Sequence, residues 1–147
     1  MSLDWFRNHF RNGVASKGSD EPCLLAVTPS EEDRNALRDI AGRRNWMVRF
    51  ADDRDQAERA LSEQPFGVIL CDRDLDGQHW SDHIERLRAK SPGSCVILIS
   101  RVNDEYLWEE VVHRGGYDVL TRPLKEAQVA PAVTLAWSYW KGWLQAG

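Results

Sequence analysis

Short apolar runs alternate with segments of helical periodicity from residue 23 to the end of the chain. The runs have the length of β-strands and cover residues 23–27, 46–50, 66–71, 95–99 and 117–121. After the first run, Ala36, Leu37, Ile40 and Ala41 repeat at helical spacing. Similar spacings follow the other runs, and the last helical segment extends from about residue 125 into the 140s. The pattern therefore predicts five strands in alternation with five helices.

The strand-like runs 23–27, 66–71 and 95–99 are apolar throughout, with no regular alternation of apolar and polar positions. Cys95-Val96-Ile97-Leu98-Ile99 shows this most clearly. Such runs are typical of strands buried on both faces, which indicates a five-stranded parallel sheet covered by helices on each side, a doubly wound α/β fold. Ligands of such sheets bind outside the carboxyl ends of the strands. The residues at those ends are Thr28-Pro29, Asp72 with its loop, Ser100-Arg101 and Thr121-Arg122-Pro123.

The two ends of the chain differ from this pattern. Residues 1–21 combine Leu3, Trp5, Phe6 and Phe10 with charged residues and then with a Gly/Ser-containing stretch, which predicts an amphipathic arm and a linker. Residues 22–147 form the domain, whose last helix is rich in tryptophan. Trp137, Trp140 and Trp143 follow one another at intervals of three and form a stripe. Either the arm covers this stripe, or the stripe is an interaction surface for a partner or a second copy.

Composition and charge exclude several classes of protein. The chain has 147 residues, of which 42% are hydrophobic and 29% charged, as in ordinary globular domains. Its apolar runs are too short to span a bilayer, and the N-terminus lacks the apolar stretch of a signal peptide. The net charge of -4 disfavours nucleic-acid binding. The three cysteines, Cys23, Cys71 and Cys95, cannot form a closed disulfide framework, which predicts a cytoplasmic protein.

Polar residues at the strand ends carry a family resemblance. Asp72 ends the third strand and is followed by Leu75 and Gly77, Ser100 ends the fourth, and Arg122-Pro123 follows the fifth. In order and spacing, residues 22–140 resemble the response-regulator receiver domain of two-component signalling, which has a flavodoxin-like fold. The resemblance implies that Asp72 accepts a phosphoryl group and that Ser100 is the switch hydroxyl. It also implies that Asp72 and the backbone carbonyl of Asp74 bind Mg²⁺, and that Arg122 holds a phosphate or a carboxylate.

Four positions depart from the family pattern. Thr28-Pro29 stands where the family has its metal-binding acidic pair, and Arg122 replaces a lysine. Val119 stands at the usual aromatic switch position. Glu31 and Glu32 are interpreted as part of the first turn of a helix, which acidic residues suit and where Ser30 and Asp33 match a capping box. The less favoured alternative is that Glu31 or Glu32 reaches back as a substitute metal ligand.

Two functions therefore remain open. In the first, the chain is a stand-alone receiver of a phosphorelay, in which a histidine kinase phosphorylates Asp72. In the second, it is a degenerate pseudo-receiver that binds partners independently of phosphorylation, because Thr28-Pro29 replaces the acidic pair. The resemblance also implies that two copies pair through the face made by the fourth helix, fifth strand and fifth helix. No Ser–His–Asp or P-loop pattern is present, so we do not expect an enzyme.

Two further features have structural explanations. His79 and His83 are four residues apart, a spacing that suits zinc, but with no third ligand nearby a solvated helix face is the favoured interpretation. Cys71 adjoins Asp72, and the alternation of a strand points its side chain into the core rather than toward a redox site.

Overall fold

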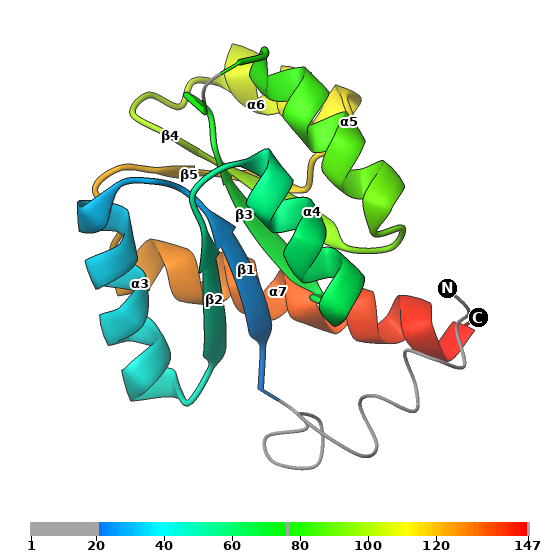
Figure 1. Ribbon diagram of the computed structural model, residues 1–147. Helices are drawn as coiled ribbons and strands as arrows, with labels where there is room; N and C mark the ends of the chain where they lie inside the picture. Colours follow the sequence, from blue (N-terminus) through cyan, green and yellow to red (C-terminus); the bar gives the residue numbers. More distant parts are fainter. Residues whose placement is uncertain (1–20, 76, 147) are drawn as a thin grey trace.

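The computed structural model describes residues 21–75 and 77–146 (Figure 1). Five parallel strands form one sheet in the order β2-β1-β3-β4-β5. Their bounds are Cys23–Val27 (β1), Met47–Ala51 (β2), Val68–Asp72 (β3), Cys95–Ser100 (β4) and Asp118–Thr121 (β5). The doubly wound α/β prediction is confirmed, with strand limits that shift by two residues at most. The amphipathic arm and linker were predicted for residues 1–21, of which residues 1–20 lie outside the described residues.

Five helices connect and follow the strands. They are α3 (Glu31–Arg44), α4 (Arg54–Glu63), α5 (Trp80–Lys90), α6 (Glu105–His113) and α7 (Glu126–Ala146). Figure 1 shows α3 and α7 on one face of the sheet and α4, α5 and α6 on the other. Among the described residues, no helix is both long enough and apolar enough to cross a membrane.

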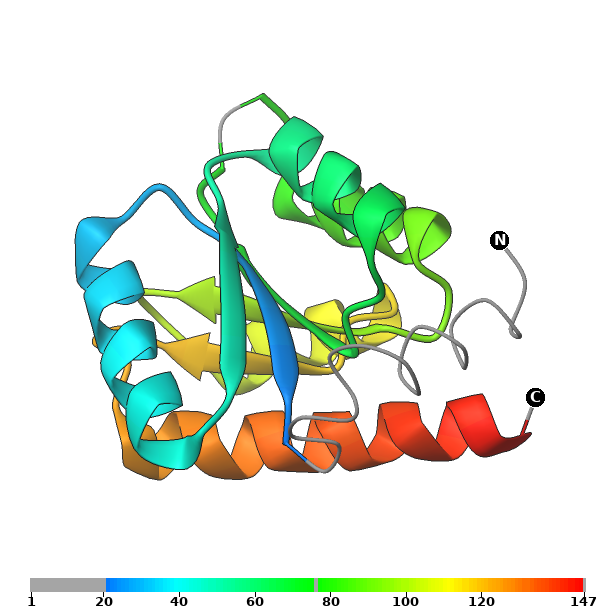
Figure 2. The same ribbon diagram turned by 60° about the horizontal axis from the view of Figure 1, so that its bottom comes forward.

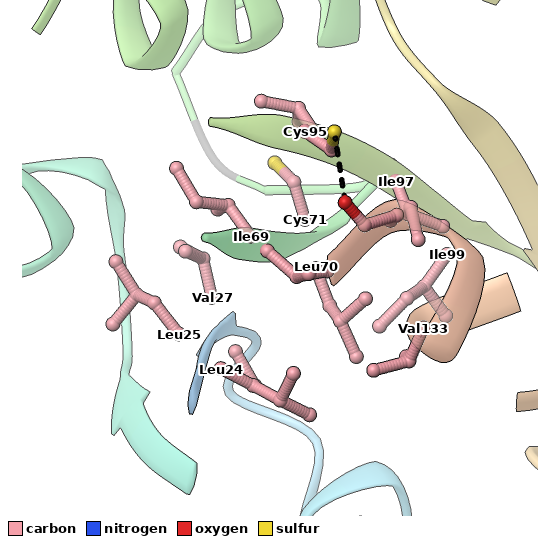
Figure 3. Close-up of a cluster of buried hydrophobic side chains, with 14 of the residues drawn as sticks. Leu24, Leu25, Val27, Ile69, Leu70, Cys71, Cys95, Ile97, Ile99 and Val133 are labelled. Carbon is pink, nitrogen blue, oxygen red and sulfur yellow. Dashed lines mark hydrogen bonds between the residues drawn. The ribbon is translucent and has the colours of Figure 1, made fainter. Parts of the chain in front are cut away.

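The core follows from the apolar strands. Every residue of β1, β3 and β4 is buried, whereas β2 at the sheet edge alternates between exposed and half-buried positions until its last residue, Ala51, which is buried. Successive side chains of a strand point to opposite faces. Leu24, Leu70 and Ile99 accordingly lie on the side of Val133 of α7, and Leu25, Ile69 and Cys71 lie on the other (Figure 3). A sheet buried on both faces leaves its strand ends as the natural place for a site.

Helix α7 runs along the whole sheet and extends beyond its edge (Figure 2). Trp137 and Trp140 are buried, with 3% and 2% of their surface exposed, and their rings pack 4.9 Å apart between centroids. The expectation of an interaction surface at these two residues is therefore wrong. They cover Gly67, just before β3, where a Cβ atom would lie 2.6 Å from Trp140 and 2.7 Å from Trp137. Trp143, the third member of the stripe, packs over Gly93 and remains 37% exposed.

We predict that Gly67→Ala lowers the free energy of unfolding by about 1–3 kcal/mol, because the added methyl group overpacks two buried indole rings. Gly42→Ala is the matched control. Gly42 lies on the exposed side of α3 with no heavy atom within 4 Å of the position of a Cβ, and alanine there raises stability by about 0.5–1 kcal/mol. Urea unfolding measures both changes. If Gly67→Ala is as stable as the wild type, the two indole rings can move aside without an energetic cost, and the prediction is wrong.

Candidate functional site

The carboxyl ends of the strands bring the predicted polar residues to one edge of the sheet. Thr28 directly follows β1, Asp72 and Ser100 end β3 and β4, and Arg122 directly follows β5. Asp72 has a central position because β3 pairs with β1 on one side and β4 on the other. Thr28, Asp72 and Ser100 are all buried, with at most 5% of their surface exposed. The sheet topology thus brings together the residues that were grouped from the sequence.

Asp33 of α3 is a member of this site that the sequence analysis assigned only to a helix cap. Its backbone N–H does donate to Ser30 Oγ at 3.3 Å, as the capping box predicts. Its side chain, however, turns inward and is 3% exposed. A signal was present, since Asp33 lies four residues before Leu37 and seven before Ile40, on the same buried face of the helix. An acidic residue on the apolar stripe of a helix indicates a buried polar site.

The guanidinium of Arg122 joins the two buried carboxylates. Its Nη2 lies 2.8 Å from Asp33 Oδ2 and 2.9 Å from Asp72 Oδ2, and its Nε lies 3.1 Å from both oxygens of Asp33. Burial lowers the pKa of Arg122, but hydrogen bonds to Asp33 and Asp72 outweigh this and raise it above its ordinary value. Arg122 is therefore a permanent cation, anchored on Asp33 by two nitrogens and shared with Asp72.

Thr28 adds a hydroxyl to the same cluster. Its Oγ1 lies 3.0 Å from Asp33 Oδ2 and 3.4 Å from Asp72 Oδ2, so its one proton can serve either carboxylate, and Asp33 is the closer. The same oxygen accepts the backbone N–H of Ser30 at 3.1 Å. Thr28 thus ties the start of α3 to the site with a neutral group.

Asp72 is buried, but it lines a pocket that opens to the surface. Its second oxygen, Oδ1, accepts the backbone N–H of Asp74 at 2.9 Å, which fixes the carboxylate. An open pocket in front of it is lined by Ser30, Glu32, Asp72, Asp74, Arg101, Arg122 and Pro123. Glu31 and Glu32, one of which was the less favoured alternative for a metal ligand, are exposed, and it is the next residue, Asp33, that enters the acidic cluster. The arrangement is a carboxylate beside a bound cation at the floor of an open pocket.

Ser100 lies next to this cluster but bonds elsewhere. Its Oγ accepts hydrogen bonds from Arg73 Nη1 at 3.3 Å and from the backbone N–H of Val102 at 3.2 Å. Its backbone carbonyl accepts the N–H of Arg122 at 2.8 Å, which links the residues that follow β4 and β5. Val119, at the position of the family's aromatic switch, is buried in the core.

The pocket's fit to a magnesium ion can be tested on its oxygen atoms. Asp33 and Asp72 are buried carboxylates, the ligand type that Mg²⁺ prefers. Both are already bound to Arg122, and Thr28 contributes a hydroxyl rather than a third carboxylate. The described part of the chain contains no group of three His, Cys, Asp or Glu residues placed to hold a metal ion. With Arg122 in this position, the residues do not fit the ion.

The histidine pair does not form a site. His79 is exposed and caps α5, where its Nδ1 accepts the backbone N–H of Ser81 at 3.2 Å. His83 is only 2% exposed, so the interpretation of a solvated helix face is wrong for it. Its Nδ1 lies 3.3 Å from Nη1 of Arg54 on α4. Burial, and then the charge of Arg54, lower the pKa of His83 below its ordinary value, so the ring is neutral at pH 7.

Cys71 behaves as a core residue. It is fully buried, and burial, with a smaller contribution from Asp72, raises the pKa of its thiol to about 12. A thiol of that pKa carries almost no thiolate at neutral pH, so it lacks the character of a redox sensor.

Comparison with known proteins places this geometry in context. The family model described as response regulator receiver domain matches residues 25–134. No curated protein matches the chain.

Three solved structures illustrate the similarity of fold. The signal receiver domain of an HD domain-containing protein from Pseudomonas fluorescens Pf-5 has a TM-score of 0.76 and 19% identity, and the match covers 86% of this chain and 93% of that one. The beryllofluoride-activated NtrC4 receiver domain dimer has a TM-score of 0.73 and 21% identity, over 80% and 98% of the two chains. The chemotaxis protein CheY4 of Vibrio cholerae has a TM-score of 0.70 and 15% identity, over 79% and 98%. At these identities the likeness shows the fold.

The lowered pKa of His83 predicts a dependence of stability on pH. The unfolded chain takes up a proton as the pH falls through about 6.5, whereas the folded chain keeps His83 neutral to lower pH. Stability from this residue is therefore complete above about pH 6.5 and is lost as the pH falls toward the folded-state pKa. Urea unfolding from about pH 7.5 down to about pH 5 should show a steeper loss for the wild type than for His83→Gln. Parallel curves for the two proteins would contradict the prediction.

Proposed function

Because this chain belongs to the response regulator receiver family, we propose that it relays a two-component signal through protein–protein contacts, with Asp72 as the acceptor of the phosphoryl group. The observation that supports this assignment is the position of Asp72 itself. Its carboxylate ends the central strand, faces an open pocket, and lies beside a cation and near a strand-end hydroxyl. Receiver domains are signalling modules, and we propose no catalytic activity beyond this transfer.

The pocket supplies the groups that such a transfer requires. One Asp72 oxygen attacks the phosphorus of a phosphohistidine on the kinase. The P–N bond breaks, and the imidazole nitrogen keeps the bonding electrons and takes up a proton. The product is an acyl phosphate on Asp72. Arg122 lies 2.9 Å from this carboxylate, and Arg101 lines the same pocket, so both can offset charge on the phosphoryl oxygens.

Ser100 is the proposed switch hydroxyl. Its present partners, Arg73 and the backbone of Val102, are local to the strand ends. Both partners donate to Ser100 Oγ, so neither of them takes the hydroxyl proton, and a phosphoryl group on Asp72 would offer that proton a charged acceptor. Rotation of Ser100 would release the N–H of Val102 and alter the loop before α6.

A second function is supported by the contacts of Arg122. A guanidinium held by Asp33 and shared with Asp72 already neutralises the acceptor, and Thr28-Pro29 supplies no acidic pair. A pseudo-receiver of this kind binds its partners without phosphorylation. The two functions differ in a single respect, which is whether Asp72 is modified before the protein binds its partner.

The proposed partner surface is the face formed by α6, β5 and α7. Large apolar side chains of α6 and α7 are exposed: Tyr106, Trp108, Val112, Leu135 and Tyr139. Tyr117, just before β5, joins them through a ring contact of 6.1 Å with Tyr139. We propose that a second copy of this chain occupies this face. The NtrC4 receiver structure mentioned above is a dimer by its description.

We also propose a cytoplasmic location. Cys23, Cys71 and Cys95 are free thiols and all three are buried, as expected for a chain that folds in a reducing compartment. A histidine kinase of that compartment is then the expected phosphoryl donor.

We predict that a small acyl phosphate, supplied with Mg²⁺, adds one phosphoryl group to the wild type and none to Asp72→Asn, because an amide is not a nucleophile here. Asp74→Asn is the matched control and should still be modified, since Asp74 contacts Asp72 through its backbone N–H. Intact-mass spectrometry measures the product. Absence of modification in the wild type would favour the pseudo-receiver, as would partner binding that Asp72→Asn leaves unchanged.

We predict that Leu135→Glu weakens self-association at least about tenfold, since a carboxylate buried in an apolar interface costs more than about 1.4 kcal/mol. Leu135 is 64% exposed in the single chain, so the substitution leaves the fold intact. Gln145→Glu adds the same charge to an exposed position of the same helix and serves as the control. Sedimentation velocity compares the three proteins. A dimer that Leu135→Glu does not weaken would place the interface elsewhere.

A further inference from the structure

The cation of this pocket is a part of the chain. Arg122 places one nitrogen between two buried carboxylates, 2.8 Å from Asp33 and 2.9 Å from Asp72. Its Nε binds Asp33 as well, so Asp33 holds the guanidinium in a fixed orientation. Only 15% of the Arg122 side chain and 3% of that of Asp33 are exposed, which protects the pair from screening by solvent.

A divalent ion at this place would meet two obstacles. The first is electrostatic, because the ion would lie next to a positive charge that cannot be neutralised by loss of a proton. The second is the supply of ligands. Both oxygens of Asp33 accept hydrogen bonds from Arg122, Asp72 Oδ2 is paired with Arg122 Nη2 at 2.9 Å, and Asp72 Oδ1 accepts from the backbone of Asp74. Mg²⁺ demands near-ideal octahedral oxygen geometry, whereas these oxygens are already oriented toward Arg122 and the backbone of Asp74.

We infer that Arg122 is the resident cation of the Asp72 pocket: it takes the place of a divalent metal ion, and it keeps such an ion out. Asp33, three residues into the site-facing end of α3, is the residue that fixes Arg122 in this role. The inference implies that phosphoryl transfer to Asp72 proceeds without a divalent metal ion. Only this part of the inference rests on the proposed function.

The hydrogen bonds of Arg122 are compatible with an anion in the pocket. Nε and Nη2 bind the carboxylates, whereas Nη1 has no hydrogen bond within the described ranges 21–75 and 77–146. Arg122 can therefore stay anchored on Asp33 by one edge and meet a phosphoryl oxygen with the other. Arg101 lines the same pocket and adds positive charge.

The first experiment measures Mn²⁺ binding by electron paramagnetic resonance, with Mn²⁺ as the probe of a divalent site. The wild type should bind no Mn²⁺ at millimolar concentration. Arg122→Met removes the charge and leaves two carboxylates beside Thr28, so it should bind Mn²⁺ at least about tenfold more tightly than the wild type. Arg101→Met is the matched control, since it removes an arginine of the same pocket that has no ion pair with Asp33 or Asp72. Mn²⁺ binding by the wild type, or equal binding by all three proteins, would overturn the inference.

Arg122→Met leaves a buried aspartate without its partner, which can prevent folding. The double variant Asp33→Asn with Arg122→Met removes both charges and should fold without binding Mn²⁺, which identifies Asp33 as a ligand in the single variant. If the single variant is unfolded without metal, Mn²⁺ should restore its far-ultraviolet circular dichroism. Failure of Mn²⁺ both to bind and to refold it would overturn the inference.

The second experiment repeats phosphoryl transfer from the small acyl phosphate in buffer stripped of divalent ions. The inference predicts that the rate changes by less than about twofold when Mg²⁺ is added, because the cation that offsets phosphoryl charge is Arg122. Transfer that occurs only with Mg²⁺ would overturn the inference and leave the proposed function intact. Transfer in neither buffer would instead overturn the role of Asp72 as acceptor, while Mn²⁺ binding still decides whether Arg122 excludes metal.

Discussion

The ion pair between Asp33 and Arg122 is the interaction on which the site depends. A buried carboxylate is tolerated only when it is paired and hydrogen-bonded, and Asp33 receives Arg122 and Thr28 together. Removing one partner of a buried pair typically costs about 3–5 kcal/mol, since the other charge is left buried. The pair therefore does more than neutralise charge. It fixes the position of the guanidinium that also reaches Asp72, and so defines the electrostatic state of the pocket.

The two ends of the sheet differ: the amino ends of the strands are tightly packed, and the carboxyl ends carry the polar site. At the amino end of β3, Trp137 and Trp140 of α7 close over Gly67, and at β4 Trp143 covers Gly93. At the carboxyl end, β3, β4 and β5 finish on Asp72, Ser100 and Thr121, Thr28 directly follows β1, and a pocket lies in front of Asp72. A rigid, tightly packed base is what allows polar and charged groups to be held in fixed positions at the other edge.

Two short contacts connect the pocket with the apolar face of α6 and α7. The backbone of Thr121, adjacent to Arg122, exchanges two hydrogen bonds with the Gln128 side chain of α7, at 2.6 and 3.1 Å. The carbonyl of Ser100 accepts the N–H of Arg122. A change in the position of Arg122 thus acts directly on the backbone between β5 and α7. These contacts give the proposed partner surface a physical link to the charge state of Asp72.

The sequence by itself determined the fold class, the place along the chain where each strand ends, and the residues that lie at those ends. Continuous apolar runs require burial on both faces, and the parallel sheet that follows brings the carboxyl ends of the strands together. Asp72, Ser100 and Arg122 could therefore be grouped, although they are scattered along the chain. Local patterns have a fixed period, and that period is enough to predict elements and their ends.

Only the tertiary structure decided which of these groups bind one another. Asp33 and Arg122 are 89 residues apart in the sequence. The helix cap, a local pattern, already accounted for an acidic residue at position 33, so nothing in the sequence required Asp33 to belong to the site. The spacing of the tryptophans showed that they share one face of a helix. The spacing does not show whether that face packs against the core or is exposed to solvent. That outcome depended on Gly67, a residue 70 positions before Trp137 whose missing side chain makes room for the rings. In both cases the deciding contact joins distant segments, and pairing between distant segments leaves no periodic trace in a single sequence.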